Sequence, residues 1–353
     1  MHAELMCEEN IVKVARSLLS IAIAVAAFGG ETEKEPPPTW PWPGPTPPEV
    51  REALMKKRFS RRPTEQELKK IEELCPDKPP AASTKPRRVL CYGRLWTHLA
   101  NAFTEESVKA LGRKTGAFET IAGDDPRLLL PESLKSFDAI FLNGLHDPQP
   151  FLPLNWKTLP PDELAAAKQL DAAVKQSILD FVMRDGKGIA AIEGAIAALG
   201  DWKEFGEMMG AFYNGHYRAK HVYKVEDPTH PVAAALGVKE LELEDQSYLP
   251  GPPYSRKRLR VLISLDLAKT PDPSTVPKQE WLKGNVKRQT DSTGRDVDYA
   301  ISWVRQHGKG RVFYCSLGVD WRTYLNPAFL RYLLAGIQFA TGDLSADTTP
   351  SEK

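Results

Sequence analysis

Short apolar runs alternate with amphipathic stretches from Arg88 to about Gly342, whereas the residues before Arg88 are rich in proline and charge. In the first part of this region, the apolar runs predict strands and the longer amphipathic stretches predict helices. The predicted strands cover residues 88–92, 118–122, 137–142 and 188–192, and the predicted helices cover residues 105–115 and 165–184. Strands and helices in alternation indicate an α/β fold with a largely parallel sheet covered on both faces.

The pattern changes after about residue 220, where strand-like runs follow one another with few helices between them. These runs cover residues 221–226, 239–244 and 260–265, and a hairpin over 299–315 precedes a last helix over 327–341. In an open α/β sheet, ligands bind outside the carboxyl ends of the parallel strands. Functional side chains are therefore expected just after the early strands.

The residues on either side of this region predict the domain organisation. Residues 30–86 read as a proline-rich linker with a short helical region, because proline clusters flank helical stretches over 48–58 and 64–74. The second stretch starts with Thr64-x-x-Glu67, the pattern of a capping box. We predict one folded domain over 87–343 and a disordered tail over 344–353.

The first 29 residues have the layout of a secretory signal peptide. Lys13 and Arg16 precede an apolar run from Leu18 to Phe28, and two glycines follow it. The run is shorter than the roughly 20 residues that cross a bilayer, which argues against a stable transmembrane anchor. We therefore expect an exported protein, periplasmic or extracellular. A buried N-terminal helix is the alternative interpretation.

Charge and cysteine content narrow the class further. Lys+Arg number 47 against Asp+Glu 46, and the folded region has no basic block, so no nucleic-acid partner is expected. Four cysteines are too few for a disulfide scaffold in a chain of 353 residues. Cys91 and Cys315 end apolar strands and are predicted to lie in the core. Cys75 lies in the linker and is a candidate exposed thiol.

Several strings, in this order and spacing, resemble the ThuA-like family. They are Arg113-Lys-Thr-Gly-Ala-Phe-Glu119, Ile178-Leu-Asp-Phe-Val182, Trp202-Lys-Glu-Phe-Gly-Glu-Met-Met-Gly210, Val225-Glu-Asp-Pro-Thr-His-Pro231 and Gly308-Lys-Gly-Arg-Val-Phe-Tyr314. The resemblance spans about 88–342. It implies a flavodoxin-like fold of the class I glutamine amidotransferase type, with a mostly parallel sheet flanked by helices. It also implies an association with trehalose and other sugar metabolism, and hence a small-molecule sugar as partner.

The turn after the fourth strand is the key position in this resemblance. Class I glutamine amidotransferases display a nucleophilic cysteine there, and ThuA-like proteins usually have a histidine, but this chain has Glu193. A carboxylate cannot replace a thiolate in attack on an amide, so cysteine-dependent glutamine hydrolysis is not expected. Three further positions that are ionisable in the family pattern are Ala197, Gln246 and Val319. His98, His216, Tyr248 and Asp320 remain.

These residues form the candidate site. Glu193 and His98 are the candidate catalytic residues for acid–base chemistry. His216, Tyr248, Asp320 and Trp96 are the candidate substrate-binding residues. Two structural interpretations stay open: His98 as a cap of the next helix, and Glu193 as an acceptor for backbone N–H groups. His221 is expected at the surface.

The sequence does not identify a cofactor, and a divalent metal is the candidate. His98, Glu193 and His216 together offer the donor types for a divalent metal, but no short ligand spacing supports one. The segment from His146 to Trp156 is long for a loop between a strand and a helix, and it is a candidate lid or pocket edge.

Two functional hypotheses follow. The first is an exported enzyme that acts on a carbohydrate or an oxidised sugar. The second is a non-catalytic carbohydrate-binding or regulatory protein on the same scaffold, suggested by the replaced ionisable positions.

Overall fold

The computed structural model describes residues 42–57, 60–94, 98–271 and 298–352. The predicted signal peptide and Trp96 lie outside the described residues. The described residues belong to one compact unit. Within the part of the chain that is described, no helix is both long enough and apolar enough to cross a membrane.

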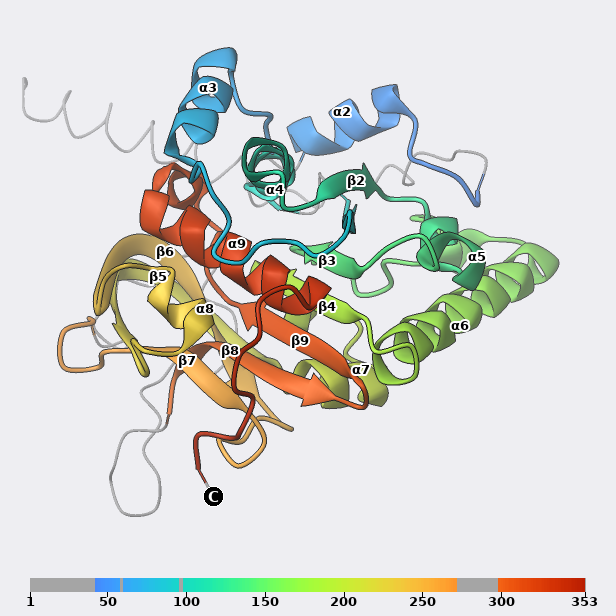
Figure 1. Cartoon of the computed structure of the whole chain (residues 1–353). Helices are drawn as coiled ribbons and strands as arrows, with labels where there is room; N and C mark the ends of the chain where they lie inside the picture. Colours follow the sequence, from blue (N-terminus) through green and yellow to red (C-terminus); the bar gives the residue numbers. More distant parts are fainter. Residues whose placement is uncertain (1–41, 58–59, 95–97, 272–297, 353) are drawn as a thin grey trace, which may run out of the picture. The chain divides into compact units, whose positions relative to one another are not determined.

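One mixed sheet organises the described part of the chain (Figure 1), with nine strands in the order β2-β1-β3-β4-β9-β8-β7-β5-β6. The strands are β1 Arg88–Tyr92, β2 Glu119–Gly123, β3 Ala139–Asn143, β4 Gly188–Ile192, β5 Phe212–Val225, β6 Glu240–Gly251, β7 Arg260–Leu265, β8 Ala300–His307 and β9 Gly310–Cys315. The pairs from β2 to β9 are parallel, and the pairs from β9 to β6 are antiparallel. The α/β fold with a parallel core is thereby confirmed.

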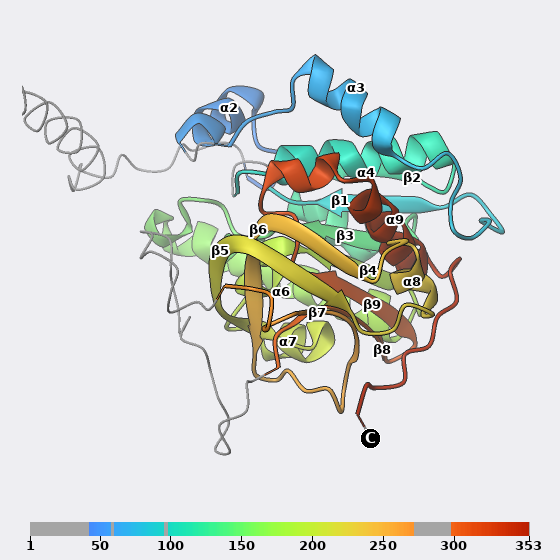
Figure 2. The same ribbon diagram turned by 90° about the vertical axis from the view of Figure 1, so that its left-hand side faces the viewer.

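Helices cover both faces of the sheet, as Figures 1 and 2 show. Their bounds are α2 Pro48–Lys57, α3 Glu65–Leu74, α4 Asn101–Thr115, α5 Pro131–Leu134, α6 Pro161–Met183, α7 Lys203–Met209, α8 Pro231–Ala234 and α9 Pro327–Thr341. Short 3-10 helices are η1 Pro126–Leu129, η2 Trp156–Thr158, η3 Glu193–Ala197 and η4 Trp321–Leu325.

Alternation along each parallel strand divides the core into two layers. On β1, Val89 and Cys91 pack into the layer shared with α4 and α9, whereas Leu90 and Tyr92 pack into the layer shared with α6 and α7. Successive side chains of a strand point to opposite faces, so a strand that is apolar throughout must be covered twice. This requirement explains the helix–strand alternation of the sequence.

The antiparallel half differs from expectation in the length of its strands. The expected strands over 221–226 and 239–244 are the ends of β5 and β6, which extend to Phe212 and Gly251 and pair along most of their length. Polar residues such as His216 and Arg218 on β5 conceal the apolar alternation there. His221, expected at the surface, is fully buried on β5 with Nδ1 contacting the hydroxyls of Tyr223 and Ser247.

The described residues before β1 contain the two expected helices, α2 and α3. Thr64 caps α3 with the predicted capping box: its hydroxyl accepts from the Glu67 N–H, and its own N–H donates to the Glu67 carboxylate. Ile71 and Cys75 are buried in the same core layer as α4. Cys75 is therefore not an exposed thiol.

The residues after α9 differ from the expected disordered tail. Within 344–352, the Ser351 N–H donates to the Leu259 carbonyl, the Val261 N–H donates to the Ser351 hydroxyl, and the His230 ring contacts the Asp347 carbonyl at 2.9 Å. Backbone and hydroxyl hydrogen bonds hold this segment beside the start of β7.

Candidate functional site

Glu193 occupies a strained turn directly after β4. Its φ angle is 58°, in the left-handed region that residues with a Cβ rarely adopt, and it begins the 3-10 helix η3. The residue is only 2% exposed. Its backbone carbonyl accepts a 2.7 Å hydrogen bond from the Tyr314 hydroxyl on β9, which helps to hold the turn. Such strain persists only where surrounding structure fixes it, and it concentrates at functional sites.

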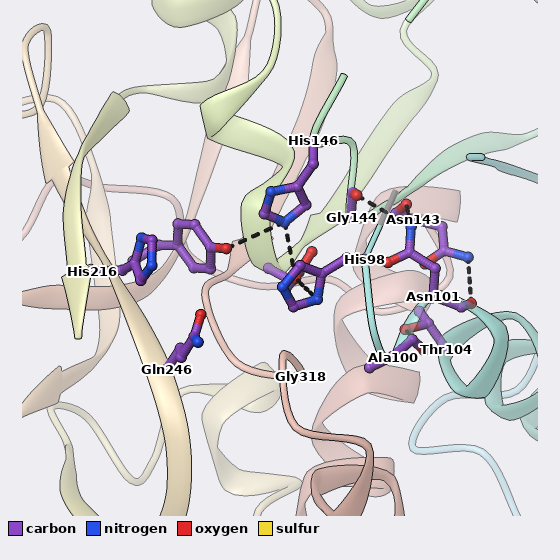
Figure 3. A network of polar contacts seen from close by, with 12 residues as sticks. His98, Ala100, Asn101, Thr104, Asn143, Gly144, His146, His216, Gln246 and Gly318 are labelled. Carbon is purple, nitrogen blue, oxygen red and sulfur yellow. Dashed lines mark hydrogen bonds and ion pairs between the residues drawn. The ribbon is translucent and has the colours of Figure 1, made fainter. Parts of the chain in front are cut away.

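Two histidines, which Figure 3 labels, converge on one oxygen of this carboxylate. His146 Nε2 lies 3.0 Å from Glu193 Oε1, and His98 Nδ1 lies 2.7 Å from the same atom. The two imidazole rings stack, with centroids 4.5 Å apart and planes 17° from parallel. The His98 contact has an ion-pair distance but not the direction of a hydrogen bond, so His98 Nδ1 has no hydrogen-bond partner among the described residues.

The three side chains come from the carboxyl ends of three adjacent strands. His98 follows β1, His146 follows β3 and Glu193 follows β4. Because β3 pairs in parallel with both β1 and β4, these strand ends meet at one edge of the sheet. The α4 helix has Ala100 at its N-cap and no side-chain capping bond, so His98 does not cap that helix.

Glycines leave the space that this convergence needs. A Cβ on Gly194 would lie 2.1 Å from His146 Nε2, and a Cβ on Gly144 would lie 2.2 Å from Glu193 Oε2. Gly144 also has a φ of 49°, a conformation that favours glycine. The packing at this strand edge therefore requires glycine at both positions.

His146 was not identified as a site residue from the sequence, although it starts the loop that was predicted to be a lid or pocket edge. Arg94 anchors this loop: its guanidinium pairs with Asp147 and donates a 2.6 Å hydrogen bond to the Leu152 carbonyl. Arg94 is only 2% exposed, so this anchor is part of the core. The available signal was a histidine three residues beyond a parallel strand that neighbours the strand of Glu193.

Tyr248 and His216 lie beside this group and come from the antiparallel half. They are cross-strand partners on β6 and β5, with ring centroids 5.0 Å apart. The Tyr248 hydroxyl lies 3.2 Å from His146 Nε2, and His216 Nδ1 contacts the Tyr213 hydroxyl at 2.7 Å. Tyr248 therefore connects His216 to the histidine pair, and His216 itself is not one of the residues that contact Glu193.

Asp320 is placed differently from the other predicted site residues. Its carboxylate pairs with Arg218 and Arg322, and it caps η4 by accepting from the Arg322 N–H. The neighbouring buried Asp245 accepts hydrogen bonds from the backbone N–H groups of Gly318 and Asp320. The η4 loop is thereby fixed to β6 by carboxylates, and Asp320 is occupied in ion pairs.

The electrostatics favour an ionised Glu193. Burial by itself would raise the pKa of its carboxyl group, but the interactions with His146 and His98 outweigh burial and hold the pKa well below its usual range. Burial raises the pKa of Tyr248 well above its usual range and that of Tyr213 to about 12, so both hydroxyls stay protonated.

The side chains of His98, His146 and Glu193 differ in their exposure to solvent. The His98 and His146 side chains are 15% and 20% exposed, whereas the Glu193 side chain is 3% exposed. A ligand therefore meets the two histidine side chains before it meets the carboxylate. This layering can position the two rings for proton transfer or for holding a cation.

Comparisons with known proteins agree with this fold. The sequence model of the family ThuA, described as "Trehalose utilisation", matches residues 88–340. A ThuA-like protein from Bacteroides uniformis is structurally similar, with a TM-score of 0.51 and 16% identity over 73% of this chain and 93% of that one. A ThuA-like protein from Parabacteroides merdae has a TM-score of 0.46 and 14% identity over 75% of this chain and 93% of that one. No curated protein matches the chain.

Proposed function

The chain belongs to the ThuA family, described as "Trehalose utilisation", and from this premise we propose that it is an exported enzyme acting on a carbohydrate or an oxidised sugar. The observation that carries the proposal is the convergence of His98 and His146 on the buried Glu193 carboxylate. Its export rests on the predicted signal peptide. The described fold supplies the strand edge at which α/β proteins bind small ligands.

In this proposal, the two imidazoles meet the sugar and Glu193 acts through them. An imidazole edge accepts a proton from a sugar hydroxyl, or from a carbon beside a sugar carbonyl, and an imidazolium returns a proton to the oxygen that becomes negative. Glu193 fixes the ring orientation and stabilises the charged ring, as a buried carboxylate does beneath a catalytic histidine. Glu193 is thus a positioning residue, and His98 and His146 are the catalytic pair.

Aromatic and polar groups beside the pair suit a sugar. The rings of Tyr248, Tyr213 and His216 lie within 5.6 Å of one another, centroid to centroid. Aromatic rings with polar tips can stack on a sugar face while their hydroxyl and imidazole groups bind sugar hydroxyls. Trp96 lies two positions before His98 in the sequence and remains a candidate for the same role.

A cysteine-dependent amidotransferase is not part of the proposal. The described cysteines are buried, and burial raises the pKa of Cys75 and Cys315 to about 12 and that of Cys91 well above its usual range. A protonated, buried thiol is a poor nucleophile. The turn that would display a nucleophile carries Glu193 instead.

The test is a screen of the purified chain against trehalose, other disaccharides and keto-sugars, with turnover and thermal shift as readouts. We expect one sugar class to raise the melting temperature and to be converted. Glu193→Gln should keep the fold and lose turnover by roughly tenfold or more. The exposed Glu132→Gln is the matched control and should behave as wild type. Normal turnover in Glu193→Gln would reject the acid–base assignment.

A carbohydrate-binding protein without chemistry is the second candidate. It is favoured by Val319, which is fully buried, and by the low exposure of Glu193, because both limit access to the carboxylate. On this alternative, sugars shift the melting temperature of the wild type and Glu193→Gln equally, and no sugar is converted by either protein.

A further inference from the structure

We propose that His98, His146 and Glu193 bind one divalent first-row transition-metal ion, with Zn²⁺ as the expected occupant. The inference deepens the proposed function and rests on it only for what the ion does to a sugar. With the ion bound, His98 and His146 are ligands, and the ion with its bound water takes over the part that their imidazoles have in proton transfer. Binding of the ion is a property of these three side chains and can be measured without any sugar.

The distances within the group match those between ligands of a small cation. The three ligand atoms lie within 4.8 Å of one another, and Glu193 Oε1 is 2.7 Å from His98 Nδ1 and 3.0 Å from His146 Nε2. With metal–ligand bonds of about 2.1 Å, neighbouring ligand atoms lie about 3.0 to 3.4 Å apart in octahedral or tetrahedral geometry. The two distances from the histidine nitrogens to Glu193 Oε1 are therefore within a few tenths of an ångström of those between metal ligands.

The polar atoms are incompletely satisfied without an ion. Both His98 Nδ1 and the second carboxylate oxygen, Glu193 Oε2, are buried and have no hydrogen-bond partner among the described residues. A buried polar atom without a partner destabilises the fold, because its contacts with water are lost and not replaced. A cation between the rings and the carboxylate gives His98 Nδ1 a bond along its lone pair and balances the carboxylate charge.

The donor set selects the class of ion. Two imidazoles and one carboxylate suit Zn²⁺ and its first-row neighbours, whereas Mg²⁺ and Ca²⁺ prefer oxygen ligands. Rigid placement on three strand ends, with Glu193 held in its strained turn, provides the preorganisation that a tight site needs. Loss of the histidine that the family pattern has at position 193 therefore does not remove the capacity to bind a metal, since Glu193 supplies an anionic ligand.

Three protein ligands leave coordination positions for water or substrate, as in catalytic zinc sites. The partly exposed side chains of His98 and His146 mark the side from which these positions are approached. An ion here would hold a sugar hydroxyl or carbonyl oxygen and withdraw electron density from it. The Tyr248 hydroxyl, 3.2 Å from His146 Nε2, lies close enough to contact such an oxygen.

The experiment uses the untagged chain after removal of metals with a chelator. Calorimetry with Zn²⁺ should give one site per chain, and Co²⁺ should give a visible absorption spectrum typical of mixed nitrogen and oxygen ligation. Mg²⁺ and Ca²⁺ should bind far more weakly. His98→Asn, His146→Asn and Glu193→Gln should each weaken Zn²⁺ binding by tenfold or more and abolish or shift the Co²⁺ spectrum.

His307→Gln is the matched control, because His307 lies at the end of β8, outside the group, and its variant should bind as wild type. Circular dichroism of each metal-free variant checks the fold, and the histidine variants decide the question if Glu193→Gln does not fold. Absence of Zn²⁺ and Co²⁺ binding in the wild type, or unchanged affinity in all three ligand variants, overturns the proposal. Zinc binding without any sugar effect supports the ion and counts against the proposed function, whereas sugar conversion without zinc binding does the reverse.

Discussion

The strained backbone at Glu193 should affect the stability of the fold independently of what the carboxylate does. At its φ of 58°, a Cβ crowds the backbone at a cost of about 1–2 kcal/mol, and only glycine avoids this cost. Glu193→Gly should therefore be more stable than Glu193→Ala by about 1 kcal/mol, reversing the usual order of these two residues. Both variants lack the carboxylate, so urea unfolding compares the backbone effect alone. Equal stabilities, or a more stable alanine variant, would contradict the strained turn.

Gly144 offers a second test at the residue scale. Gly144→Ala places a methyl group 2.2 Å from Glu193 Oε2, so it should displace the carboxylate and reduce sugar turnover or metal affinity. Gly116→Ala is the matched control, because Gly116 also has a positive φ but has nothing within 4 Å of an added Cβ. Both variants pay the same kind of backbone cost, and only Gly144→Ala should change the site. A site unaffected in Gly144→Ala would show that the Glu193 position is not constrained by this contact.

The buried His221 makes the free energy of unfolding sensitive to acid. Burial lowers the pKa of His221 to about 3, below its ordinary value near 6.5, so the unfolded chain binds this proton more readily. The contribution of His221 is complete above pH 6.5 and is lost as the pH falls toward 3, by about 1.4 kcal/mol per pH unit. Urea unfolding at pH 7 and pH 5 should show a smaller loss for His221→Gln than for wild type. An identical loss would place the acid sensitivity elsewhere.

At the scale of elements, the packing of α3 bears on whether the segment before β1 is a tether. The sequence predicts a linker, yet Ile71 is 1% exposed and packs in the layer shared with α4. Ile71→Ala should then lower the free energy of unfolding by about 2–4 kcal/mol, as for other large-to-small changes in a core. The exposed Leu68→Ala on the same helix is the control and should have little effect. A neutral Ile71→Ala would support the tether.

Elements bounded by strong local signals could be predicted from the sequence to the residue. The strands β1, β4 and β7 and the helix α9 start and end as expected, because apolar runs, glycine and proline mark their limits. The first halves of β5 and β6 could not, since polar residues fill them and their pairing with each other decides their structure. Long-range pairing overrides local propensity in such strands.

The same distinction applies to the candidate site. Glu193 and His98 could be chosen from the sequence because each follows an apolar strand at a position where functional groups collect. His146 could not be placed beside them without the order of β1, β3 and β4 in the sheet, which no local pattern contains. Asp320 has the same local signal, but the arginines that occupy its carboxylate lie on β5 and in η4.

At the scale of the whole molecule, the described cysteines can report where the folded structure opens. Cys75 follows α3, Cys91 lies on β1 and Cys315 lies on β9, and all three are free and buried. A thiol reagent can label each only when its surroundings open, so labelling rates rank the opening free energies of these three places. Mass spectrometry that finds Cys75 labelled together with Cys91 and Cys315 would show a single cooperative unit. Faster labelling of Cys75 would instead show that α3 detaches while the sheet stays closed.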